Sequence, residues 1–259
     1  GRYDSAQMVV QGLPGQQLAF IPSGQRFFCR DGGNRFLIPT QVAGLPSVYL
    51  CRNVAAMIQL MGIINLTPDS FFAPSRYDAS RALSTIGTMA EEGASIIDLG
   101  AVSTRPGASD VGLEEEWERL RPVLEALADP VARHGMLISI DTFRSEIVRR
   151  SYESIGEFIV NDISAGEDDP RMLSLVGQLK LPYIAMHKRG NPRTMDSLCT
   201  YGDDIVEELK RYFKHFGERA AAEGIKEWML DPGLGFAKSP AQCWEILERL
   251  EELDMPGHP

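Results

Sequence analysis

Three polar residues stand directly after short apolar runs, at the points where buried strands would end. They are Asp141 in "LISID", Asn161 in "EFIVN" and Asp231 in "EWMLD". A carboxylate accepts hydrogen bonds from N–H and amino groups, whereas an amide can both donate and accept. Three such groups at strand ends indicate one binding site for a polar ligand. The plain alternative is that each aspartate caps a helix or closes a loop.

Two segments that follow apolar runs are rich in groups able to hold an anion. Residues 65–78 read "NLTPDSFFAPSRYD", and residues 100–109 read "GAVSTRPGAS". Hydroxyls, an arginine and backbone N–H groups freed by glycine suit a phosphate or a carboxylate. The same residue types dominate ordinary turns, so these segments taken alone leave both interpretations open.

Composition argues against several classes of protein. The net charge of this 259-residue chain is 26 − 36 = −10, so the electrostatic footprint of a nucleic-acid binder is missing. The longest nearly apolar run, residues 54–64, is too short to span a bilayer, and no secretion signal is recognisable near Gly1. The cysteines lack a C-x-x-C pair, which predicts reduced thiols in a cytoplasmic protein instead of disulfides or zinc ligands: Cys29, Cys51, Cys199 and Cys243.

Alternating strands and helices must position these residues. Short apolar runs predict six strands, at 57–65, 95–100, 137–141, 157–162, 182–187 and 227–231. Amphipathic stretches between them predict helices at 78–92, 113–134, 145–155, 171–180, 203–223 and 240–253. Strands that alternate with helices indicate βαβ units and a parallel sheet. Because the strands are apolar almost throughout, we expect a sheet covered on both faces or closed into a barrel.

The polar strand ends favour a (β/α)8 TIM barrel within the α/β class. A doubly wound sheet serves its ligand from two neighbouring strands, whereas a barrel recruits the ends of many strands. Nearly every predicted strand ends in a polar residue: Asn65, Asp98, Asp141, Asn161, His187 and Asp231. We predict a barrel over residues 57–259, with six β/α units visible. Residues 1–56 are predicted to form a β-rich extension of unknown role, with strand-like pieces at 17–22, 26–31, 35–39 and 47–51.

Six motifs occur in an order that resembles dihydropteroate synthase. They are "MGIINLTPDSFF", "IIDLGAVSTRPGA", "ISIDTFRSE", "IVNDISAG", "YIAMHKRGNPRTM" and "LDPGLGFAKS". The resemblance implies a TIM-barrel transferase of folate biosynthesis that forms a C–N bond. It would condense 6-hydroxymethyl-7,8-dihydropterin diphosphate with 4-aminobenzoate, giving 7,8-dihydropteroate and diphosphate with Mg²⁺. Sulfonamides would then compete with aminobenzoate.

The resemblance also implies roles for individual residues. Asp141, Asn161 and Asp231 would read the polar edge of the pterin, which alternates donors and acceptors as guanine does. Met186 and Phe236 would pack near the ring faces, although plain core packing explains them nearly as well.

The diphosphate and aminobenzoate ends of the site would use other residues. Asn65 would lie at the magnesium and diphosphate end, where its amide oxygen is a suitable hard ligand. The two loops would close over aminobenzoate and exclude water, through Thr67, Pro68, Asp69, Ser70, Phe71, Ser103, Thr104, Arg105 and Pro106. For His187 we prefer a packing or hydrogen-bonding role, because the four histidines show no paired spacing for a metal.

Two other functions remain open at this point. One is a pterin-binding methyltransferase domain that handles methyltetrahydrofolate, which would have no use for the pieces "NLTPDSFF" and "STRPG". The other is a barrel that binds a pterin without turnover. For partners we expect only the pterin diphosphate and 4-aminobenzoate substrates, with neither nucleic acid nor membrane, and the sequence leaves a homodimer open.

The predicted barrel has fewer units than it needs. The chain stops at "LDMPGHP" after the sixth helix, whereas eight units need about 50–60 further residues. The family's seventh-strand S-R-K-S and eighth-strand R-x-H motifs are both missing. We therefore expect the sequence to be incomplete relative to the working enzyme, and residues 1–259 alone to be aggregation-prone and catalytically feeble.

Overall fold

The computed structural model describes most of the chain from residue 59 onward. The described residues are 59–66, 76–102, 111–190, 194–202, 204–253 and 255, with four short strands before them at 8–11, 19–21, 27–31 and 34–38. None of the helices within these ranges is long and apolar enough to cross a membrane.

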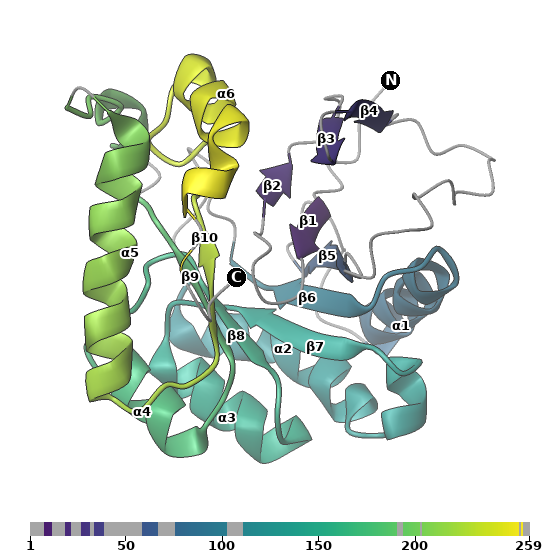
Figure 1. Cartoon of the computed structure of the whole chain (residues 1–259). Coiled ribbons are helices and arrows are strands. Elements are labelled where there is room, and N and C mark those ends of the chain that lie inside the picture. The colour runs from purple at the N-terminus through teal and green to yellow at the C-terminus, as the bar shows by residue number, and fades with distance from the viewer. Residues whose placement is uncertain are drawn as a thin grey trace.

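Six parallel strands form the body of the structure. They are β5 (Gln59–Asn65), β6 (Ile96–Gly100), β7 (Leu137–Asp141), β8 (Ile159–Asp162), β9 (Tyr183–Met186) and β10 (Trp228–Asp231). Each strand pairs with its neighbours in the sequence, so the spatial order is β10-β9-β8-β7-β6-β5. In Figure 1, β6 and β7 run across the view while β9 and β10 stand upright, which shows how strongly the sheet curls.

Helices alternate with these strands along the chain. They are α1 (Arg76–Glu91), α2 (Leu113–Leu127), α3 (Ser145–Ile155), α4 (Met172–Leu179), α5 (Ile205–Ala222) and α6 (Pro240–Glu248). Helices α1 to α5 connect the strands and cover one side of the sheet, while α6 follows β10 at the top of the view in Figure 1. Three short 3-10 turns supplement them: η1 (Pro130–Arg133), η2 (Met195–Ser197) and η3 (Leu250–Leu253). The predicted alternation of strands and helices is confirmed.

Helix α5 illustrates how the sequence builds this layer. The Asp204 carboxylate caps its start by accepting from the backbone N–H groups of Val206 and Glu207. Spacings of three and four then bury Phe213 and Phe216 completely, or nearly so, against the sheet. The Phe216 ring stacks on Tyr183 of β9 with 5.7 Å between centroids. Each such buried side chain contributes about 1.5–3 kcal/mol of transfer free energy.

The two faces of the sheet carry different residues because side chains alternate along a strand. Ile97 and Leu99 of β6 face the helices and belong to the large outer core. Their neighbour Ile96 faces inward, where it joins a small apolar cluster with Met61, Ile159, Ile184 and Met229. This inner cluster forms an apolar floor beneath the C-terminal ends of the strands.

Several predicted boundaries were wrong, each for a local reason. Helix α1 begins at Arg76, two residues before the predicted start at residue 78. Helix α2 ends at Leu127, seven residues before the predicted end, because Asp129 accepts from the Val131 N–H and opens a separate turn at Pro130. Helix α6 begins at the predicted residue 240, where Ser239 caps it through a reciprocal capping box with Gln242.

The N-terminal strands extend the sheet without adding barrel units. Strand β1 (Met8–Gln11) pairs antiparallel with β5, and β2 (Ala19–Ile21) pairs antiparallel with β1. Strands β3 (Phe27–Asp31) and β4 (Asn34–Ile38) form a separate hairpin. Within the described residues the sheet is therefore an open, curled one with six parallel strands. The predicted strand at 47–51 lies outside those residues.

Candidate active site

A polar layer lies directly above the apolar floor on the inner face of the sheet. Residues that are partners across paired strands point to the same face, and a step of two residues keeps that face. Asn65 of β5 lies four residues after the floor residue Met61. Strands β6, β8, β9 and β10 each carry a residue two positions after their own floor residue: Asp98, Asn161, Met186 and Asp231. Ser139 and Asp141 of β7 join the same face through their partners Asp98 and Gly100. The structure thus brings five predicted residues together: Asn65, Asp141, Asn161, Met186 and Asp231.

Gly100 opens the space in which two of these side chains meet. A Cβ atom on Gly100 would lie 3.1 Å from Asp141 Oδ2 and 3.6 Å from Asn65 Oδ1. The strand-end glycine therefore lets an amide oxygen and a carboxylate oxygen approach the same point. Both Asn65 and Asp141 are half-buried, so a ligand can reach them from the strand ends.

The carboxyl of Asp141 lies in an unusually acidic environment. Surrounding protein atoms and the nearby carboxylates of Asp98, Glu116 and Asp162 raise the pKa of Asp141 well above its usual value. A group that donates N–H bonds to this carboxylate would relieve the cost of its charge. Such an environment is typical of a functional carboxylate awaiting a partner.

Asp231 is held in place by the tight turn that follows β10. Its Oδ1 atom accepts from the Gly233 N–H at 2.8 Å. Gly233 has φ +66°, and a Cβ atom there would lie 2.1 Å from the His187 carbonyl oxygen, so only glycine fits. Burial raises the pKa of Asp231 to about 6, and within the described part of the chain Gly233 is the one hydrogen-bond donor to this carboxyl.

His187 and Lys238 form a buried pair behind the strand ends. The Lys238 ammonium lies 2.9 Å from His187 Nδ1 and donates to the carbonyl oxygens of His187 and Phe236. Burial and the neighbouring Lys238 lower the pKa of His187 to about 2, so its ring is neutral. The ring also packs edge-on against Tyr212, with centroids 4.7 Å apart. The predicted packing and hydrogen-bonding role of His187 is confirmed.

Two arginines hold the ends of the loop that joins β6 to α2. Arg119 donates to the carbonyl oxygen of Ala101 at 2.7 Å, and Arg144 donates to that of Val111 at 2.6 Å. Arg144 also pairs with Glu116, whose fully buried carboxylate accepts from the Thr142 hydroxyl. This network connects the end of the loop to Thr142 and Arg144, which follow Asp141 in the chain.

The predicted loop residues lie outside the described part of the chain. They are Thr67, Pro68, Asp69, Ser70, Phe71, Ser103, Thr104, Arg105 and Pro106. Phe236 is described and half-buried, in a turn in which its N–H donates to the Gly233 carbonyl. It therefore lies five residues after Asp231, in the loop that follows β10 and not on the strand itself.

Sequence comparison identifies relatives of most of the chain. Residues 61–259 match the family described as pterin binding enzyme. The chain belongs to this family. It is 41% identical over 203 residues to dihydropteroate synthase of Synechocystis, covering 77% of this chain and 68% of that protein. It is also 42% identical to the folic acid synthesis protein of Pneumocystis carinii, but it spans only 27% of that relative's length.

Solved pterin-binding structures share the fold of this family member. The Yersinia pestis dihydropteroate synthase, in complex with a sulfonamide drug, superposes with a TM-score of 0.69 at 36% identity. That match covers 77% of this chain and 71% of the other. The Xanthomonas albilineans dihydropteroate synthase with 4-aminobenzoic acid gives 0.64 at 35% identity, over 76% and 71% of the two chains. The predicted resemblance is confirmed.

One member of the polar layer was missing from the predicted pterin-binding set. Asp98 belongs to the series of polar strand ends, but nothing local distinguishes its side chain from that of a loop aspartate. Its importance depends on a contact with Asn161, which lies 63 positions away. Lys238 was missed for the same reason, since its partner His187 is 51 positions away.

Proposed function

We propose that this member of the pterin-binding family carries the activity of a dihydropteroate synthase. It would join 6-hydroxymethyl-7,8-dihydropterin diphosphate to 4-aminobenzoate and release diphosphate. The observation that carries the proposal is the convergence of Asp141, Asn161 and Asp231 on the inner face of three different strand ends. Rigid strand ends pre-organise hydrogen-bonding groups better than a mobile loop would.

These three residues would read the polar edge of the pterin ring. The carboxylates of Asp141 and Asp231 accept from ring N–H and amino groups, and the Asn161 amide offers both an acceptor and a donor. Met186 lies in the same layer as Asp231, so its thioether would pack against a ring face. The apolar floor would support the ring from below.

The reaction begins when the bond from the pterin methylene carbon to the diphosphate oxygen breaks. The diphosphate leaves with the bonding electron pair, and the resulting pterin cation lies in the negative field of Asp141 and its neighbours. The aniline nitrogen of aminobenzoate then donates its lone pair to the methylene carbon and loses a proton. No covalent enzyme intermediate is needed.

The residues present fit a magnesium ion at the diphosphate end. Asn65 Oδ1 points to the space above Gly100, and amide oxygens are suitable ligands for a hard cation. Asn65 would hold the ion together with substrate phosphate oxygens and water. When bound, Mg²⁺ neutralises charge that develops on the departing diphosphate.

The two loops complete the proposal. Thr67–Phe71 and Ser103–Pro106 would enclose aminobenzoate and protect the cation from water, with Arg105 meeting the carboxylate of aminobenzoate. We also propose that the curled sheet is part of a (β/α)8 barrel. The inward curl of its six parallel strands, four of which end in a polar residue, supports this.

An assay of diphosphate release tests the function. The protein is incubated with pterin diphosphate and Mg²⁺, with and without 4-aminobenzoate, and we expect release that requires aminobenzoate. Exchange of a methyl group from methyltetrahydrofolate in place of this activity would contradict the proposal.

Calorimetry with a pterin tests the site itself. Asp141→Asn removes a charge-assisted bond and buries a mismatched donor, so we expect a loss of at least ~2 kcal/mol of binding free energy. Unchanged affinity would remove Asp141 from the site.

A further inference from the structure

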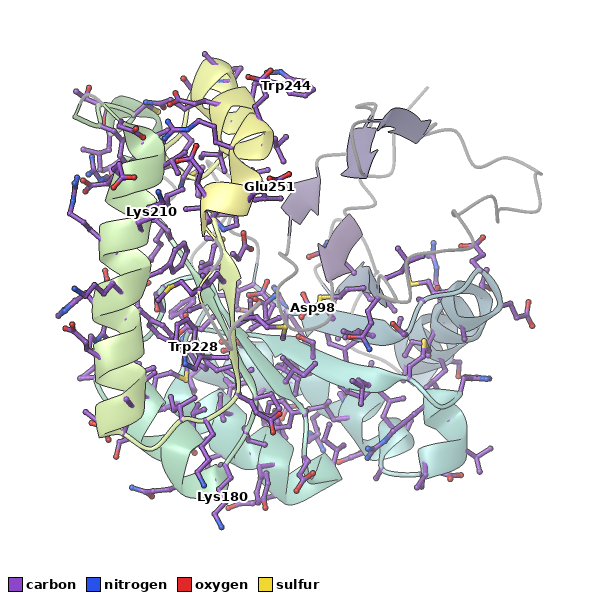
Figure 2. All side chains as sticks on the ribbon, viewed as in Figure 1. Asp98, Lys180, Lys210, Trp228, Trp244 and Glu251 are labelled. Carbon is purple, nitrogen blue, oxygen red and sulfur yellow. The ribbon has the colours of Figure 1, made fainter. Side chains whose placement is uncertain are left out.

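Asp98 is a buried carboxylate that the proposed chemistry does not use. It lies in the middle of β6, is only 3% exposed, and faces inward between the apolar floor and Gly100. Figure 2 labels it on the concave side of the curled sheet, away from the layer of helices. A carboxylate is rarely buried to this extent without a partner that compensates its charge.

Its best-formed hydrogen bond comes from the amide of Asn161, which is proposed to read the pterin. Asp98 Oδ2 accepts from Asn161 Nδ2 at 3.2 Å, across the width of β7. The other oxygen, Oδ1, is buried and makes no well-formed hydrogen bond within the described residues, although the hydroxyl of Ser139 on the neighbouring strand lies close enough to stabilise the Asp98 charge. Asn161 thus makes the one well-formed hydrogen bond to the Asp98 side chain among the described residues.

An ionised carboxylate permits one orientation of the Asn161 amide and excludes the other. Burial raises the pKa of Asp98 to about 6, with the Ser139 hydroxyl and the Asn161 amide opposing the rise, so Asp98 is ionised at pH 8. A carboxylate then only accepts, and a flipped Asn161 would set its oxygen against Asp98 Oδ2 in a buried site. Two acceptors facing each other without a proton cost as much as a lost hydrogen bond.

We propose that Asp98 is a positioning residue for pterin recognition, which holds the Asn161 amide in one orientation so that its oxygen faces the ligand. The inference rests on the proposed pterin site and explains how that site would select among ring systems. An Asn161 oxygen that cannot turn away demands an N–H donor on the ligand. A ring that offers a carbonyl at that position meets an acceptor and is rejected.

The contrast with Asp162 shows what a merely structural carboxylate looks like here. Asp162 is fully buried on the same strand as Asn161 but faces outward. It accepts from the backbone N–H groups of Ser164 and Gly166 and from the hydroxyls of Ser164 and Tyr183. Its oxygens thus bind the turn after β8 and Tyr183 of β9, so Asp162→Asn serves as a matched control for altering a buried carboxylate.

Binding at pH 8 of two ring systems tests the proposal. Pterin carries a 2-amino donor, and lumazine carries an oxygen in its place. We expect wild type to prefer pterin, and Asp98→Asn to reduce that preference about tenfold, because a neutral amide at position 98 tolerates either Asn161 orientation. Asp162→Asn is expected to shift the melting temperature but to leave the ratio of the two affinities unchanged.

A double-mutant cycle separates positioning from direct contact. In an Asn161→Ala background the amide that Asp98 orients is absent. Asp98→Asn should then have no effect on the ratio of pterin to lumazine affinity. Retention of the full effect in that background overturns the inference, as does an equal loss of both ligands in Asp98→Asn. Wild type that binds neither ring removes the proposed function and this inference together, whereas binding with an additive cycle removes the inference alone.

The ligand-free protein offers a second readout. The side-chain amide resonances that disappear in Asn161→Ala identify Asn161 in a ¹⁵N spectrum. We expect one of its N–H protons to be shielded from exchange in wild type and in Asp162→Asn, and exposed to exchange in Asp98→Asn. Equal exchange in wild type and Asp98→Asn would contradict the proposed hold on the amide.

Discussion

At the residue scale, the buried carboxyl of Asp231 is placed for ligand binding but destabilises the ligand-free protein. Its carboxyl is 3% exposed and its pKa is raised by burial to about 6. Ionisation above that pH is harder in the folded state than in the unfolded state, where the pKa stays near its ordinary value. A ligand that donates to Asp231 relieves this cost, which an empty site must bear.

Asp231→Asn is therefore expected to stabilise the ligand-free protein while weakening pterin binding. The asparagine oxygen can still accept from Gly233, but no buried charge remains. The raised pKa of Asp231 corresponds to a gain of about 1–3 kcal/mol in the free energy of unfolding of Asp231→Asn at pH 8. Denaturant unfolding at several pH values measures it.

The sign of the pH dependence makes this prediction specific. The folded wild-type carboxyl takes up its proton near pH 6, before the unfolded one does, so wild type regains stability as pH falls from about 6 towards 4. The advantage of Asp231→Asn should shrink over that window. An advantage that stays constant from pH 8 to pH 4 would mean that the charge of Asp231 is not its cause.

At the scale of single elements, the loop between β6 and α2 depends on how its ends are held. Arg119 of α2, whose side chain is 10% exposed, fixes the Ala101 carbonyl at the start of this loop. Arg119→Ala removes that hydrogen bond without touching Asp141 or Asn161. We expect the KM for 4-aminobenzoate to rise about fivefold, in line with one lost hydrogen bond, while pterin affinity is unchanged.

Arg121 provides the matched control on the same helix. Its side chain is 42% exposed, and its ion pair with Glu118 lies on the surface. Exposed pairs of this kind contribute little to stability. Arg121→Ala should therefore leave the KM for 4-aminobenzoate and the affinity for pterin near their wild-type values. A comparable rise in KM for both variants would indicate a general effect of α2 and not of the loop's first residues.

The approach of α4 to the end of α5 sets a second element-scale prediction. A Cβ atom on Gly177 of α4 would lie 1.8 Å from the Glu223 carbonyl oxygen. Because that oxygen belongs to backbone, Gly177→Ala must push the helices apart, and we expect a loss of about 1–3 kcal/mol or more. Gly202→Ala, which meets nothing within 4 Å, should be nearly neutral in the same thermal melts.

The elements could be predicted from sequence better than the site could. Apolar runs and helical spacing are local signals, so all six parallel strands and six helices were found, most within two residues of their ends. The pairing of β1 with β5 and the contact between Asp98 and Asn161 join residues that are far apart in the chain. No local pattern encodes such a contact, whereas Asp141, Asn161 and Asp231 were found because each strand end is marked by its own sequence.

At the scale of the whole molecule, the net charge opposes binding of an anionic substrate, whereas hydrogen-bonding groups at the strand ends favour it. The chain carries a net charge of −10, yet the proposed substrate is a diphosphate. Three of the acidic residues in this count, Asp98, Asp141 and Asp231, lie on the described inner face itself. Selectivity must then come from short-range bonds at the strand ends, since the long-range field repels the substrate.

The association rate of pterin diphosphate should therefore increase with ionic strength. The Debye length falls from about 30 Å at 0.01 M salt to about 8 Å at 0.15 M, so added salt screens the repulsion between the chain and the anion. Stopped-flow fluorescence of the pterin, without Mg²⁺, measures the rate. The uncharged 6-hydroxymethylpterin binds the same residues without the diphosphate, and its rate should not change. A rate for the diphosphate that falls with salt would show that cations near the strand ends, and not the net charge, govern its approach.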